Sequence, residues 1–179
     1  SPIDFVFLFT TEHYAEDCVE ISRLVHQRLA PANLIGCTGE GVIGSNREFE
    51  RQAAISLLAG SLPGIRLKSF RISQSRLDAF QEDIEQAYET VGFEPSQKPS
   101  IILLAEPFSI KTMTLVSTLD VLFPGSVKLG GVASAGMSPG LNRMYWDNQE
   151  EPAVESPIGD FFALGHGVRR YVDSLPVSV

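Results

Sequence analysis

The sequence contains few of the residues that mark several common protein classes. Its 179 residues include only two cysteines, Cys18 and Cys37, which are too far apart for a CxxC metal or redox motif and too few for a disulfide framework. We therefore expect a reducing, intracellular environment. The sequence also has no apolar run close to the roughly 20 residues that span a bilayer, so we expect no transmembrane segment.

Positive charge is scarce as well. The chain has 14 Lys and Arg residues against 22 Asp and Glu residues, which gives a net charge of −8, and its longest basic run is the pair Arg169 and Arg170. Nucleic-acid backbones and anionic lipid surfaces are bound through clustered lysines and arginines. We therefore expect neither nucleic acid nor a membrane surface as a partner, and we expect the charge to favour solubility.

The three histidines form no recognisable metal or catalytic pattern. His13, His26 and His166 have no carboxylate at a spacing that resembles a metal site. We interpret His26 as a surface or helix-end residue and His166, which lies between two glycines, as part of a loop. The sequence therefore predicts no metal site and no cofactor.

Hydrophobic periodicity predicts strands that alternate with helices. Unbroken apolar runs are typical of strands that are covered on both faces, and apolar residues at every third or fourth position are typical of helices. The predicted strands are residues 5–9, 34–37, 53–59, 65–72, 101–105 and 127–130. The predicted helices are residues 14–30, 76–91 with Ser75 as N-cap, and about 109–122.

The order of these elements contains the same unit twice, at about residues 3–72 and 99–165. Each unit has a buried strand, a helix, a second strand and a turn rich in small residues. A repeated unit of this kind favours two pseudo-symmetric halves that share one core. The predicted fold class is α/β, with pseudo-duplicated β-α-β-β units around one core, mixed sheets, and helices packed outside.

An offset of 94 residues aligns the two halves and places Gly36 on Gly130. After an insertion, residues 53–60 correspond to residues 160–165. Because few residues are identical, this alignment depends on the pattern of apolar and small residues. In halves that share a core, the two small-residue turns, at residues 36–44 and 131–136, are predicted to face each other at the junction.

Two glycine-rich turns that meet in this way suit a ligand site. Glycine lets a ligand approach the backbone closely, and successive amides of such a turn can bind an anion or a carboxylate. Both turns follow buried strands, where α/β proteins tend to bind their ligands. The predicted ligand-binding residues are Gly36, Cys37, Thr38, Gly39, Glu40, Gly41, Gly130, Gly131 and Ser134.

The same residues have structural explanations that the sequence leaves open. The glycines also suit tight turns and close strand packing, and they match neither a Walker motif nor GxGxxG. Glu40 is either the partner of a ligand's ammonium group or a solvent-exposed side chain. Glu106 either lies near the junction or, together with Ser109, interacts favourably with the start of a helix. Cys37 has a position suited to a nucleophile, but no signature surrounds it, and a small buried cysteine is the commoner role. We therefore predict no catalytic residue.

Four blocks of residues stand out in the order 34–44 (LIGCTGEGVIG), 54–59 with 62–64 (AISLLA and LPG), 102–109 (ILLAEPFS) and 119–134 (LDVLFPGSVKLGGVAS). Together they resemble the N-terminal domain of the FIST (F-box and intracellular signal transduction) family, and the match is closest to FIST sequences of cyanobacterial type. The resemblance covers about residues 3–146, so we assign residues 1–146 to a FIST N-terminal-like domain.

The resemblance implies a sensory α/β domain that binds small ligands such as amino acids, either alone or joined to signalling domains or an F-box. The sequence departs from the family pattern after Trp146. We treat residues 147–179 as a divergent C-terminal extension in which a FIST C-terminal domain is not recognisable. The chain starts at Ser1 without Met. A removed leader would suit a chloroplast, and otherwise we expect the cytoplasm.

These observations predict a non-catalytic FIST-type sensory module that binds a small ligand such as an amino acid. The alternative is a structural or assembly subunit that docks on a larger protein complex, which the proline-containing apolar tail at residues 175–179 favours. A cysteine-dependent enzyme ranks behind both.

Overall fold

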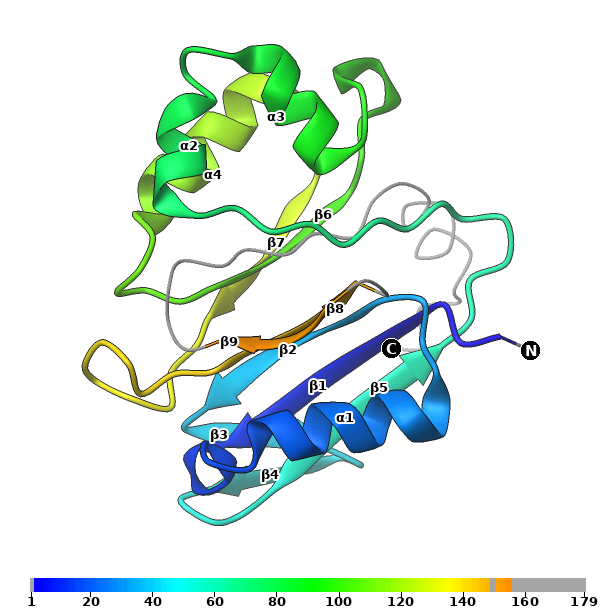
Figure 1. Ribbon diagram of the computed structural model, residues 1–179, viewed down its shortest axis with the longest axis vertical. Coiled ribbons are helices and arrows are strands. Elements are labelled where there is room, and N and C mark those ends of the chain that lie inside the picture. The colour runs from blue at the N-terminus through cyan, green and yellow to red at the C-terminus, as the bar shows by residue number, and fades with distance from the viewer. Residues whose placement is uncertain (1, 149–150, 156–179) are drawn as a thin grey trace, which may run out of the picture.

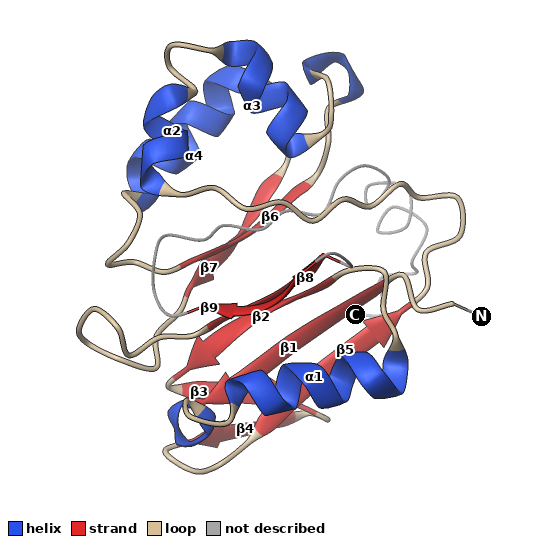
Figure 2. Ribbon diagram, in the orientation of Figure 1, coloured by secondary structure: helices blue, strands red, loops and turns tan. Residues whose placement is uncertain are grey.

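The computed structural model describes residues 2–148 and 151–155, which form four layers (Figure 1). One helix, α1 (Cys18–Leu29), covers one face of a five-stranded sheet. A pair of parallel strands packs on the other face, and three helices cover the outer face of that pair. Helices thus form the two outer layers and strands form the two inner layers (Figure 2).

The five-stranded sheet has the order β5-β1-β2-β8-β9. β1 and β2 are parallel, so the chain has to cross over between them, and α1 is this crossover. β5 pairs antiparallel with β1, and β8 pairs antiparallel with β2 and β9. The strands are β1 (Phe5–Thr11), β2 (Leu34–Gly39), β5 (Ile55–Gly60), β8 (Met144–Asn148) and β9 (Glu151–Glu155).

Alternate residues of β1 face opposite layers. Val6 and Leu8 are fully buried in the cluster that packs against α1. Phe7 and Phe9 face the other way and pack toward the second strand pair. Both faces of β1 are therefore covered by apolar contacts, as the unbroken apolar run at residues 5–9 predicts.

The second sheet, as far as the described residues go, is the parallel pair β6 (Ile101–Ala105) and β7 (Lys128–Val132). α4 (Thr112–Leu122) crosses from β6 to β7, and α2 (Gln74–Ala79) and α3 (Ile84–Val91) pack beside it. Their apolar side chains form one buried cluster with the strands, which includes Leu77, Phe80, Ala87, Val91, Ile101, Leu103, Leu115, Leu119 and Phe123.

The two strand layers meet in a separate buried cluster, which we call the seam. Its buried members are Ile35, Cys37 and Met144 from the five-stranded sheet and Leu104 and Ala133 from the β6–β7 side. Because these five side chains come from four separate stretches of the chain, the seam joins the two strand layers.

The remaining elements lie at the periphery. The hairpin β3 (Gly41–Gly44) and β4 (Arg47–Glu50) follows β2, and two short 3-10 helices are η1 (Glu12–Tyr14) and η2 (Pro95–Gln97). None of the helices in the described part of the chain has the length and apolar character needed to cross a membrane.

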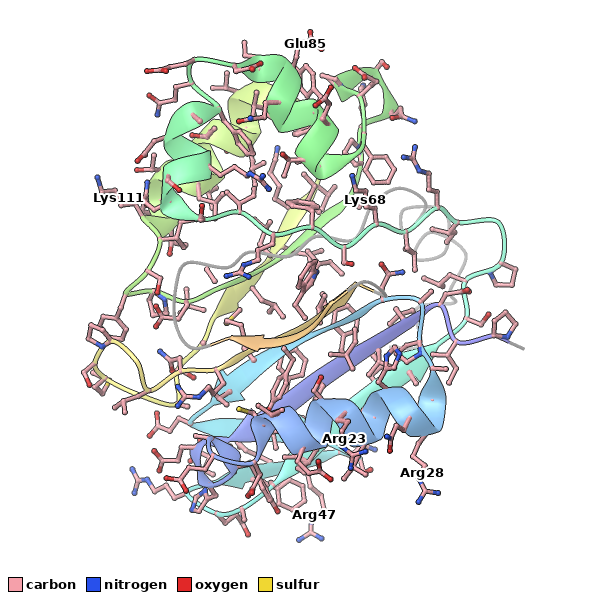
Figure 3. The ribbon with its side chains drawn as sticks, viewed as in Figure 1. Arg23, Arg28, Arg47, Lys68, Glu85 and Lys111 are labelled. Atoms are coloured by element: carbon pink, nitrogen blue, oxygen red, sulfur yellow. The ribbon has the colours of Figure 1, made fainter. Side chains whose placement is uncertain are left out.

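The predicted α/β class is confirmed. Five of the predicted strands lie within two residues of β1, β2, β5, β6 and β7. The prediction of a strand at residues 65–72 is wrong. Its polar residues hold the segment against other elements: Arg66 and Lys68 donate hydrogen bonds to the carbonyls of Gly92 and Glu89 at the end of α3, at 2.7 and 3.0 Å (Lys68 in Figure 3). Carbonyls at the end of a helix have no partner within the helix, and here the two cationic side chains supply one. Residues 65–72 therefore bind the end of α3 and do not pair with a strand.

The single helix predicted at residues 76–91 is in fact two helices. α2 begins after Ser73, whose hydroxyl accepts a hydrogen bond from the Arg76 N–H, so Ser73 and not Ser75 is the N-cap. α3 begins after Asp83, whose carboxylate accepts from the Gln86 N–H. Asp at this position is a strong helix start, which explains why the chain breaks between the two helices.

The two β-α-β units share one further feature. Gly36 of β2 lies so close to β1 that a Cβ atom there would be 1.7 Å from the Leu8 carbonyl oxygen. A Cβ atom on Gly130 of β7 would be 1.8 Å from the Leu103 carbonyl oxygen of β6. The full duplication remains a prediction, because residues 160–165 lie outside the described residues.

Replacing either glycine by alanine should therefore destabilise the fold. Gly36→Ala and Gly130→Ala each force a methyl group into a backbone carbonyl, and we expect each to lower the free energy of unfolding by about 3 kcal/mol or more. Gly131→Ala is the matched control, since nothing lies within 4 Å of its added Cβ, and it should change stability by less than about 0.5 kcal/mol. Urea denaturation of the three variants measures this; equal stabilities would contradict the close packing.

Candidate functional site

The structure brings the two predicted turns together. The backbone N–H of Ser134 donates to the Thr38 carbonyl at 3.2 Å, and the Ser134 hydroxyl accepts from the Glu40 N–H at 3.3 Å. Both turns follow the carboxyl ends of parallel strands, β2 and β7, and the seam holds these ends side by side. The junction predicted from the repeat therefore exists, with a direct backbone contact at its centre.

Three of the predicted site residues are inside the protein. Gly36, Cys37 and Thr38 are buried. Gly36 packs on β1, and the Thr38 hydroxyl accepts a hydrogen bond from the Arg143 N–H at 2.9 Å. These side chains and the Gly36 backbone hold strands together, which is the structural explanation that the sequence left open for them.

The rest of the first turn lies at the surface. Gly39 is half-buried, and a Cβ atom there would lie 2.9 Å from the Gly41 carbonyl oxygen, so the tight turn requires glycine. Glu40 and Gly41 are exposed. Of the two roles considered for Glu40, the structure shows the exposed side chain, and it lines none of the cavities described below.

Gly130 and Gly131 line a cavity of about 280 Å³ beside α4. This volume is close to the lower end of the range of pockets that hold small molecules, about 300–1,000 Å³. Its walls are mostly apolar, and Thr112 contributes a hydroxyl. The lining residues are Leu103, Ala105, Thr112, Val116, Lys128, Leu129, Gly130, Gly131 and Val132.

The one charged side chain in this lining is already neutralised. The ammonium group of Lys128 forms an ion pair with Asp120 at 2.8 Å and donates to the carbonyl of Phe123 at 2.9 Å. Its side chain is only 8% exposed. Lys128 therefore compensates the carboxyl end of α4, where the helix dipole is negative, and its charge is not directed at a ligand.

The second turn depends on a buried polar pair that the sequence did not reveal. Glu106, at the end of β6, and Asn142 are both fully buried. The Asn142 amide donates to the Glu106 carboxylate at 2.9 Å, and its carbonyl accepts from the Gly136 N–H at 2.9 Å. The same carboxylate accepts from the hydroxyl of Ser109, which was the neighbour identified in the sequence. Glu106 thus anchors the loop that carries Ser134.

With this geometry in view, comparison with known proteins identifies the family. The model of the FIST N domain matches residues 4–154. The chain belongs to the FIST N family. The FIST N domain is a sensory signalling domain, so the family and the general role predicted from the sequence are confirmed.

Relatives of this FIST N chain occur in mycobacteria. An uncharacterized protein of Mycobacterium tuberculosis is 25% identical over 140 residues, which are 78% of this chain and 35% of that protein. An uncharacterized protein of Mycobacterium bovis is 21% identical over 141 residues, which are 79% of this chain and 35% of that protein. The chain therefore spans about a third of the length of these relatives. No solved structure matches it.

Cys37 is a poor nucleophile in this FIST N domain. It is 6% exposed, and burial raises the pKa of its thiol to about 12. The thiolate is the reactive form of cysteine, and it is scarce at neutral pH when the pKa is this high. Among the described residues, no three His, Cys, Asp or Glu side chains are placed to hold a metal ion.

Tyr145 is a second buried group that sequence reasoning missed. It is fully buried between β2 and α1, and its hydroxyl is 2.8 Å from the Thr10 hydroxyl. Burial raises the pKa of the Tyr145 phenol to about 12. The folded protein thus holds two protons, on Cys37 and Tyr145, that the unfolded chain releases near pH 9 and 10.

This difference should make the protein less stable in alkali. The contribution of Tyr145 to the free energy of unfolding is fully present below pH 10 and is lost as the pH rises toward 12. Between pH 8 and pH 10.5 we expect Tyr145→Phe to lose about 1 kcal/mol less unfolding free energy than the wild type, and Cys37→Ala about 2 kcal/mol less. Urea denaturation at the two pH values measures both, and an unchanged pH dependence in the variants would contradict the burial of these groups.

The Glu106–Asn142 pair should be energetically important. Asn142→Asp places two carboxylates at hydrogen-bond distance inside the protein, and we expect a loss of about 3 kcal/mol or more at pH 7. Adding Glu106→Gln restores a donor opposite the new carboxylate and should recover at least about half of the loss. Chemical denaturation of the single and double variants measures this. If Asn142→Asp is as stable as the wild type, or if the second change brings no recovery, the pair does not anchor the loop.

Proposed function

We propose that this chain is a non-catalytic sensory module that binds a small ligand such as an amino acid in the cavity between α4 and the β6–β7 pair. The cavity supports this proposal by its size, its apolar walls and the glycine backbone on one side. The protonated, buried thiol of Cys37 supports the absence of catalysis. The resemblance to cyanobacterial-type sequences supports a plastid as the compartment in a photosynthetic host.

The backbone of β7 supplies a donor for the ligand. The Val127 carbonyl accepts from Ile101, and the Ala133 N–H donates to Ala105, so odd-numbered residues of β7 turn their polar groups to β6. Strand alternation then turns the N–H of Gly130 away from β6, at the edge where this residue lines the cavity. A ligand carboxylate would accept from this N–H.

The other walls suit the rest of an amino acid. Leu103 and Val116 offer an apolar surface for an aliphatic side chain. The Thr112 hydroxyl donates to the Ile110 carbonyl at 3.5 Å, and its free lone pairs would accept from the ligand's ammonium group. In this arrangement Thr112 takes the role that the sequence suggested for Glu40.

The turn residues would then connect the cavity to the rest of the domain. Val132 lines the cavity, and Ser134, two residues later, contacts Thr38 and Glu40 of the other half. A ligand that shifts the end of β7 would therefore act on the first turn through Ser134. Of the predicted site residues, Gly130 and Gly131 are proposed to contact the ligand. The others are proposed to support the two turns or to transmit a shift of β7 to the first turn.

Filling the cavity should abolish binding. We expect isothermal titration against a panel of the standard amino acids to detect at least one ligand for the wild type, and Val116→Phe to weaken its binding at least tenfold because the new ring occupies the cavity. Val121→Phe is the matched control on the same helix, at a position that is 80% exposed and outside the cavity lining, and it should bind like the wild type.

Two results would overturn the ligand proposal. One is the absence of heat above background for every amino acid, and the other is unchanged binding by a folded Val116→Phe variant. An assembly subunit would then be the better explanation. The exposed apolar residues Val127, Leu129 and Val132, which are 40%, 49% and 48% exposed, favour this second function. It requires that the protein copurifies with a larger complex.

A further inference from the structure

A second cavity, of about 550 Å³, lies along residues 65–73, the segment that runs between the helices and the five-stranded sheet (Figure 1). Its lining comes from this segment, from the neighbouring helices α2 and α3, and from Trp146 of β8. Its volume is within the range of pockets that hold small molecules. It shares no lining residue with the cavity beside α4, so any ligand it binds would be a separate one.

The segment that forms one wall of this cavity is held on both sides. Phe70 and Ile72 are buried in the cluster of the three helices, and Leu67 packs in the seam. The Ser69 N–H donates to the side-chain carbonyl of Asn33 at 3.1 Å. The backbone of the segment is therefore fixed, and so are the points from which its polar side chains extend.

The lining of the cavity is positively charged, although the whole chain has a net charge of −8. Among the described residues that line it are three cations, Lys68, Arg71 and Arg76, and one carboxylate, Glu89. Arg71 is already engaged in an interaction of its own. Lys68 and Arg76 are therefore the cations that a ligand could use.

Neither of these two cations has a carboxylate partner among the described residues. The Lys68 ammonium donates to the backbone carbonyl of Glu89 at 3.0 Å, which uses one of its three donors. Burial, and after it the charge of Arg66, lowers the pKa of Lys68, and a nearby anion would offset both effects. Arg76 is exposed, and its backbone N–H, not its guanidinium, bonds to the Ser73 hydroxyl.

We propose that this cavity binds a small organic phosphate ester, with Lys68 and Arg76 on the phosphate and the Trp146 ring against the organic group. A phosphate monoester carries a charge of about −1.5 to −2 at neutral pH, which two cations match better than one carboxylate would. The arginine fork suits phosphate oxygens, and lysine adds a point charge. The volume leaves room for an organic group beside the phosphate. This inference does not rest on the proposed amino-acid site.

The one tryptophan of the chain makes this proposal measurable. Because Trp146 lines the cavity, its indole N–H signal in an NMR spectrum of the full chain reports on this cavity alone. We expect phenyl phosphate to shift the signal in a saturable way, with a Kd below about 1 mM. Benzoate has the same ring and a single negative charge, and it should bind at least about tenfold more weakly.

Variants that change the charge of the lining in opposite directions test the contacts. Arg76→Gln removes a cation and should weaken the binding of phenyl phosphate at least about fivefold. Glu89→Gln removes the carboxylate from the lining and should strengthen binding at least about twofold. Arg28→Gln is the matched control, because Arg28 is exposed on α1, on the far side of the molecule from Lys68 (Figure 3), and it should bind like the wild type.

Three results would overturn the proposal. The first is a Trp146 signal that does not move with phenyl phosphate up to about 10 mM. The second is benzoate binding as tight as that of phenyl phosphate, which would identify a carboxylate as the ligand. The third is equal affinity of the Arg76→Gln, Glu89→Gln and Arg28→Gln variants, which would show that the charges of the lining do not hold the ligand. None of these results bears on the cavity beside α4.

Discussion

The apolar seam between the two strand layers is the contact on which the rest of the structure depends. Each layer contains a parallel β-α-β unit with its helix on the outer face, and within the described residues the apolar inner faces of the two units cover each other. Burial of Ile35, Cys37 and Met144 against Leu104 and Ala133 sets the two units in one orientation. The contact between the two turns follows from that orientation, because both turns begin where the seam strands end.

Much of this fold could be predicted from the sequence, because its inner strands are covered on both faces and therefore appear as unbroken apolar runs. The run at residues 5–9 became β1 and the run at 101–105 became β6. The alternating residues 65–72 also looked like a strand. Their conformation is decided by distant contacts, because Arg66 and Lys68 bind the end of a helix at carbonyls 26 and 21 residues later in the chain. The break between α2 and α3 was visible in principle, since Asp83 is a strong N-cap inside the predicted helix.

The candidate site was predictable in part. The repeated order of elements predicted that the glycine-rich turns meet, but it treated all the glycines alike. The structure separates them by function: Gly36 permits close strand packing, whereas Gly131 has free space around it and lines a cavity. Such a distinction requires the positions of neighbouring strands. The pair of Glu106 and Asn142 was equally invisible, because a hydrogen bond across 36 residues leaves no local pattern.

The arrangement of the seam can be measured directly, since its buried members Ile35, Leu104, Ala133 and Met144 all carry methyl groups. A methyl-methyl NOE spectrum of the full chain in solution should show cross-peaks that join Ile35 or Met144 of one layer to Leu104 or Ala133 of the other. If cross-peaks appear within each layer and none appears between them, the two β-α-β units are not packed on each other. The junction of the turns and the functions derived from it would then have no structural basis.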